Sequence, residues 1–269
     1  MDNLTKKSLP SGSLPSYRKP PVNEVVCGMR FSTPEKLRLP HIGPLWDKFR
    51  ADYPNIQHAQ PIASTIGEVP IDVVTGFPIP RFWLINRSDD QLVQFQFDRL
   101  YFNWRRRQSE YPRYPFVIEQ FEHVLHTIEA FLKEYDLGEL NPIEYELNYI
   151  NHIPKGEGWD TIEDLPKIFQ DFGWTQRSER FLPKPANITW AMEFPMQGQM
   201  GRLIISLKQA TRIEDKVPLF VLELATRGFD GTGDKKVLRK WFDIAHEWIV
   251  KGFTDITRPE VQKMWEREK

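Results

Sequence analysis

Alternation of apolar and polar side chains is the feature that most constrains the fold of this chain. In residues 25–31 and again in residues 143–149, every second side chain is apolar. A two-residue period puts the apolar side chains on one face of a β-strand and the polar ones on the other. Segments 188–194, 203–207 and 220–224 repeat the pattern. We therefore expect antiparallel strands that form a sheet with one buried face.

Two long segments change from a period of two to the period of a helix. They are "FVIEQFEHVLHTIEAFLKEY", residues 116–135, and "KKVLRKWFDIAHEWIVKGF", residues 235–253. Each has an apolar stripe at helical spacing, which is typical of a helix packed on a sheet. A shorter helix is expected within residues 35–54.

The order strand, helix, strands, long helix occurs twice, and the two halves meet near Gly138. We expect an α+β fold in which two such units form one curved antiparallel sheet backed by the two long helices. Helix-grip-like sheets are the alternative. Residues 1–20 are expected to be a disordered leader. Residues 21–138 would form the first half and residues 139–269 the second, packed as one continuous unit.

The segment "QLVQFQFDRLYFNWR", residues 91–105, has an irregular pattern. Val93, Phe95 and Phe97 are odd-numbered, whereas the apolar residues after Asp98 that continue the alternation are even-numbered: Leu100, Phe102 and Trp104. A two-residue period changes phase only where the chain bends or gains a residue. We interpret the segment as one long strand with a β-bulge near Asp98.

Composition excludes several classes of protein. The chain has 36 Lys and Arg and 37 Asp and Glu, so its whole surface is not cationic. Its single cysteine, Cys27, allows neither an intramolecular disulfide nor a cysteine-based zinc site. No apolar run approaches the roughly 20 residues that span a bilayer. We expect a soluble cytoplasmic protein that uses no cofactor or metal and has no membrane partner.

The chain resembles known proteins in two respects, its order of elements and several of its sequence segments. The element order resembles the duplicated arrangement of the TATA-binding protein. The segments "PPVNEVVCGMRF", "QFQFDRLYFNWRR", "YPRYPF" and "AHEWIVKGFTDIT", with Trp265, resemble an uncharacterised, sporadically distributed bacterial family across residues 20–265. That distribution suggests mobile genes, and is compatible with phage defence or a toxin–antitoxin role.

An arginine-rich aromatic segment is the first candidate site. Arginine beside exposed rings can bind phosphate and stack on bases. In the alternative reading the tryptophan belongs to the core and the arginines end a solvated strand. The candidate residues are Arg99, Trp104, Arg105, Arg106, Arg107 and Arg113.

The polar face of the sheet is the second candidate. Glu144 and Glu146 would lie about 6.5–7 Å apart on one strand face. That spacing suits a carboxylate pair for glycoside hydrolysis or a divalent metal. An ordinary wet face, or a surface for a partner, is the alternative. The face would carry Glu24, Gln94, Gln96, Glu144, Glu146, Asn148, Glu193, Ser206, Lys208 and Glu223.

No catalytic motif stands out, so the leading hypothesis is a non-enzymatic interaction module. It would bind a protein partner or form a homo-oligomer. The alternative is nucleic-acid or nucleotide binding through residues 99–113. The third is a hydrolase that uses carboxylates of the open sheet face.

Overall fold

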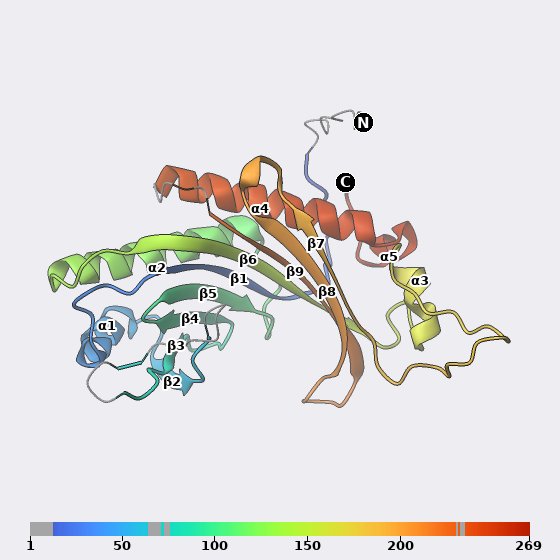
Figure 1. Cartoon of the computed structure of the whole chain (residues 1–269), viewed down its shortest axis with the longest axis horizontal. Helices are drawn as coiled ribbons and strands as arrows, with labels where there is room; N and C mark the ends of the chain where they lie inside the picture. The colour runs from blue at the N-terminus through green and yellow to red at the C-terminus, as the bar shows by residue number, and fades with distance from the viewer. Residues whose placement is uncertain (1–12, 64–70, 73–75, 230, 232–234) are drawn as a thin grey trace.

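A nine-stranded antiparallel sheet dominates the described part of the molecule (Figure 1). The computed structural model describes residues 13–63, 71–72, 76–229, 231 and 235–269. The strand order is β2-β3-β4-β5-β1-β6-β9-β8-β7. The strands are β1 Val22–Ser32, β2 Asn55–Ala59, β3 Arg81–Ile85, β4 Gln91–Gln96, β5 Arg99–Arg105, β6 Asn141–Pro154, β7 Thr189–Pro195, β8 Arg202–Thr211 and β9 Pro218–Gly228.

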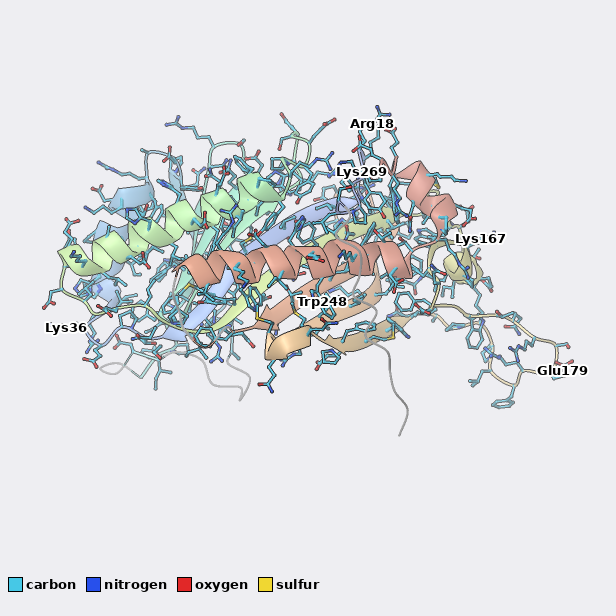
Figure 2. All side chains as sticks on the ribbon, turned by 90° about the horizontal axis from the view of Figure 1, so that it is seen from above. Arg18, Lys36, Lys167, Glu179, Trp248 and Lys269 are labelled. Atoms are coloured by element: carbon cyan, nitrogen blue, oxygen red, sulfur yellow. The ribbon has the colours of Figure 1, made fainter. Side chains whose placement is uncertain are left out.

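The α+β class with a large antiparallel sheet is confirmed, and so are both long helices. Helix α2 contacts β1 and β5, and α4 contacts β6, β8 and β9. Figure 2 views the molecule from the side of these two helices. Within the described residues, no helix has the length and apolar character needed to cross a bilayer. The helices are α1 Ile42–Phe49, α2 Tyr114–Glu134, α3 Leu165–Ile168, α4 Lys235–Ile256 and α5 Pro259–Met264.

The centre of the sheet joins the N-terminal and C-terminal parts of the chain. Strand β1 pairs with β5 on one side and with β6 on the other. Strand β6 pairs in turn with β9. The first five strands therefore lie on one side of the β1–β6 junction and the later ones on the other.

The two long helices also contact each other above the sheet. The rings of Phe121 in α2 and Phe242 in α4 have centroids 5.2 Å apart, and both side chains are fully buried. The Tyr114 hydroxyl donates a hydrogen bond of 2.8 Å to Asp243. Burial of such large rings stabilises this layer.

The expected single long strand over residues 91–105 is wrong. The segment is a hairpin, in which β4 pairs antiparallel with β5 and Gln96 lies opposite Arg99. The two intervening residues, Phe97 and Asp98, make the turn. Across a two-residue turn, odd-numbered residues pair with even-numbered ones, as Phe95 does with Leu100. The hairpin thus explains the change of phase without a bulge.

Part of the segment expected to be a leader is packed against the body. Tyr17 is buried, forms a bridge with Arg267, and its hydroxyl lies 2.8 Å from that of Thr254. Its ring meets Phe253 of α4 edge-on, with centroids 5.3 Å apart. Residues 1–12 of that segment lie outside the described residues.

Candidate functional site

The face of the sheet opposite α2 and α4, called the open face here, carries a dense set of polar side chains. Directly paired residues of neighbouring strands point to the same face. One such row runs Trp83–Gln94–Tyr101–Gly28–Glu146–Arg227–Arg202 across seven strands. Ten polar residues were expected from the sequence to share one face of the sheet. The pairing register places all ten on the open face.

A pocket of about 260 Å³ lies in the middle of the open face. Ile62 and Ala63, which precede β3 in the chain, lie at its border. The backbone N–H of Ile62 donates to Oε1 of Gln96 at 2.8 Å, which fixes this border to β4. The polar lining residues of this central pocket are Arg30, Arg81, Gln94, Arg99, Tyr101, Glu144, Glu146, Asn148 and Arg227.

The floor of the central pocket depends on a glycine. A Cβ atom on Gly28 would lie 2.0 Å from Cδ1 of Tyr101 and 2.8 Å from the carbonyl oxygen of Leu100. The Tyr101 ring therefore lies directly against the Gly28 backbone of the neighbouring strand, a close approach that no larger residue permits. Burial raises the pKa of Tyr101 to about 12, so its hydroxyl is neutral at physiological pH.

A chain of side-chain hydrogen bonds orients the polar groups on one side of the pocket. Oε1 of Gln94 accepts from the Arg81 guanidinium at 2.7 Å and from the Trp83 indole at 3.1 Å. Nε2 of Gln94 donates to Asn103 at 2.7 Å, and Nδ2 of Asn103 donates to Glu24 at 2.5 Å. The chain crosses four strands and fixes the position of Arg81 at the pocket border.

Two arginines of the pocket already have acidic partners. Arg99 is 5% exposed and donates to both carboxylate oxygens of Asp98, at 3.2 and 3.0 Å. Arg227 lies 3.2 Å from Oε1 of Glu146. Burial nevertheless raises the pKa of Glu146, because loss of water penalises its charged form more than Arg227 favours it.

Several single polar atoms in the pocket lack hydrogen-bond partners among the residues that the structure describes. Nε of Arg81, Nε of Arg227 and Oδ1 of Asn148 are buried without a hydrogen bond. Asn148 is only 6% exposed. Arg30 and Glu144 occupy paired positions in β1 and β6, yet neither belongs to an ion pair within the described chain. Buried polar atoms without partners are rare in proteins and are usually satisfied by water, an ion or a ligand.

The structure brings three of the candidate residues from the sequence together and separates the others. Arg99, Glu144 and Glu146 line the central pocket. Trp104 is 1% exposed and belongs to the core. Arg105 and Arg107 both bind the carboxylate of Asp89.

Arg106 and Arg113 instead hold the segment before β1 in place. Arg106 donates to the carbonyl oxygens of Val22 and Pro20, and Arg113 donates to those of Tyr17 and Arg18. Both arginines line a separate groove of about 600 Å³ at the end of β1. The arginine-rich segment is therefore not one continuous patch.

Sequence reasoning missed Arg30, Arg81, Arg227 and Tyr101 as members of one site. None of them was among the ten residues expected on the polar face, and Tyr101 is itself buried. They line one pocket because the strand order places β3, β5, β1 and β9 within the same consecutive run of strands, β3-β4-β5-β1-β6-β9.

An aromatic cluster lies on the other face of the sheet, beneath α4. The hydroxyls of Tyr111 and Tyr149 are 2.8 Å apart, and that of Tyr149 is 3.1 Å from Nδ1 of His246. The His246 ring stacks on Tyr114, with centroids 4.0 Å apart. Burial lowers the pKa of His246 to about 4, so the ring is neutral near pH 7. A pocket of about 240 Å³ adjoins this cluster.

The described residues contain no group of three or more His, Cys, Asp or Glu side chains placed to hold a metal ion. Burial raises the pKa of the Cys27 thiol, so it is not a thiolate at neutral pH. The described residues therefore offer neither a metal site nor a reactive thiolate in addition to the central pocket.

Comparisons with known proteins identify no relative. Neither the protein-family models, nor the curated proteins, nor the solved structures contain a match to this chain.

Proposed function

We propose that the protein is a binding module whose central pocket accepts the anionic group, carboxylate or phosphate, of a small ligand. The observation that carries this proposal is the concentration of buried, unpartnered polar atoms beside four arginines in one pocket. Guanidinium groups bind carboxylate and phosphate through paired, charge-assisted hydrogen bonds.

The charge balance of the pocket supports an anion. Four arginines face two glutamates there, and Asp98 compensates Arg99 from outside the lining. One positive charge remains in a site that is partly removed from water. Electrostatic attraction is stronger in such a site than at an open surface. A volume of about 260 Å³ suits a small molecule or a single charged side chain rather than a nucleic-acid strand.

Arg30 offers a direct test, because no described side chain depends on it for an ion pair. Binding of inorganic phosphate and of acetate would be measured by calorimetry at low ionic strength. We expect Arg30→Gln to weaken the preferred anion by roughly tenfold, the loss of one charge-assisted contact. Arg50→Gln, which removes the exposed arginine directly after α1, serves as the matched control and should bind as the wild type does.

Three results would count against the proposal. They are the absence of binding by either anion at millimolar concentration, unchanged binding in Arg30→Gln, and equal weakening in Arg50→Gln. Preference for phosphate over acetate, or the reverse, would identify the anionic group.

A protein partner remains a second candidate function. Three large apolar side chains are exposed at the ends of two protruding segments: Phe181 (97%), Leu182 (59%) and Ile213 (80%). The segment around Glu179 extends far from the body in Figure 2. Changing Phe181 and Leu182 to Ser together should abolish capture of such a partner without lowering stability. If association survives, this surface is not the interface.

The finer sequence interpretations stay predictions. The two-unit arrangement is supported by the matching order of strands and helices on either side of the β1–β6 junction. The hydrolase hypothesis has the raised pKa of Glu146 in its favour. A role in phage defence or in a toxin–antitoxin pair rests on resemblance alone.

A further inference from the structure

We propose that the ligand of the central pocket is zwitterionic, with an ammonium group that binds Glu144 in addition to the anionic group that binds the arginines. This inference rests on the proposed function and specifies its ligand class. It follows from the way in which opposite charges are distributed across the pocket.

One side of the pocket is cationic. Arg81 of β3, Arg99 of β5 and Arg30 of β1 come from strands on one side of the β1–β6 junction. Of these three, Arg99 alone has an acidic partner among the described residues. An anionic group is therefore best placed above β1 and β5, within reach of Arg30 and Arg81.

The other side is acidic and begins at β6. Glu146 is paired with Arg227 of β9, so its charge is already compensated. Glu144 is two residues away on the same face and has no ion-pair partner within the described chain. Oδ1 of Asn148, on the same strand, is a buried acceptor without a donor. The carboxylate of Glu144 can pair with a cation, and Oδ1 of Asn148 can accept a hydrogen bond.

A simple anion would satisfy only half of this pocket. It would leave Glu144 without an ion-pair partner, one strand away from the negative charge of the ligand, and like charges at that distance repel. An ammonium group placed above β6 would pair with Glu144 and could donate to Asn148. A zwitterion therefore removes both the repulsion and the unmet acceptors.

The register limits the length of such a ligand. Arg30 and Glu144 are directly opposite each other, and neighbouring strands are about 4.8 Å apart. Arg99 is one strand farther from Glu144. The two charged groups of the ligand should then be separated by about one to two strand spacings. This favours an ω-amino acid or an aminoalkyl phosphate over an α-amino acid.

Matched pairs of compounds test the inference. Calorimetry would compare 4-aminobutyrate with butyrate, and 2-aminoethyl phosphate with ethyl phosphate, at pH 7 and low ionic strength. In the wild type we expect the ammonium-bearing member of the preferred pair to bind roughly tenfold more tightly. Glycine, whose two charged groups are closer together than one strand spacing, should bind less well than 4-aminobutyrate.

The variant Glu144→Gln should remove the preference for the ammonium group and leave binding of the simple anion unchanged or stronger. Glu193→Gln changes an open-face glutamate outside the pocket and should retain the preference. Equal affinity within each pair, or an undiminished preference in Glu144→Gln, would overturn the zwitterion and leave the anion site standing. If none of the compounds binds, the anion site itself fails.

Discussion

The roles of Arg99 and Arg105 follow from the strand face on which they lie, not from their neighbours in the sequence. Arg99 and Arg105 point to the open face of β5. Trp104 lies at an alternate position that points to the other face, where it packs on Tyr111 with ring centroids 5.3 Å apart. The core position of Trp104 was one of two readings of the sequence, and it is confirmed. Membership of Arg99 in the central pocket could not be predicted, because it depends on which strands become neighbours.

His246 should make stability depend on pH between about 4 and 6.5. The folded protein holds the ring neutral because burial lowers its pKa from 6.5 to about 4, and the nearby Asp243 and Glu247 oppose this shift only in part. The unfolded chain takes up a proton below pH 6.5. The stabilising contribution is therefore complete above pH 6.5 and is lost as the pH falls towards 4, by about 2–3 kcal/mol.

Urea unfolding at pH 7.5, 5.5 and 4.5 measures this loss. His246→Phe keeps a ring against Tyr114 but cannot bind a proton, so its stability should fall less over the same range. Parallel losses in the two proteins would show that other groups cause the acid sensitivity.

At the scale of single elements, strong periodicity was enough to predict the long helices. The residues of a turn were not enough to predict a hairpin. Helices α2 and α4 could be predicted because their apolar stripes run over many residues. The β4–β5 hairpin was missed because its turn residues, Phe97 and Asp98, include neither glycine nor asparagine. The turn is instead held by side chains, since Asp98 accepts hydrogen bonds from Arg99 and from Gln96.

Asp98→Asn should therefore destabilise the protein. It leaves the guanidinium of Arg99, whose side chain is 6% exposed, without its counter-charge. We expect the free energy of unfolding to fall by about 3 kcal/mol, the lower end of the range for removal of one partner of a buried ion pair, because the Asp98 side chain is partly exposed.

Asp47→Asn is the matched control for this change. It breaks an ion pair with Arg50 in which both side chains are mostly exposed, so it should cost less than about 1 kcal/mol. Urea denaturation of both variants provides the comparison. Equal, small losses would mean that Asp98 does not hold the hairpin together.

At the scale of the whole molecule, the alternation and the two long helical segments were enough to predict an α+β protein with a large antiparallel sheet. The strand order was not predictable, because pairing of β1 with both β5 and β6 joins segments distant in the sequence. The central pocket exists only in that order, with side chains from β3, β4, β5, β1, β6 and β9. Sequence patterns could therefore give its residue types but not the site.

The two halves should unfold as one cooperative unit. They share the β1–β6 ladder, and α2 contacts α4 through Phe121 and Phe242. In native-state hydrogen exchange, we expect the most protected amides of α2 and α4 to open with free energies within about 1 kcal/mol of each other. A much lower opening free energy for one of the two helices would show that the halves unfold independently.

The position of β1 also has a consequence for synthesis on the ribosome. It is the first strand of the sheet to be translated, yet both of its neighbours come much later in the chain. At about 5–20 residues per second, several seconds pass before β5 emerges. Until then the apolar side chains of β1 lack both of the strands that flank it in the sheet. A chaperone that covers extended apolar segments of nascent chains would find its first target in β1.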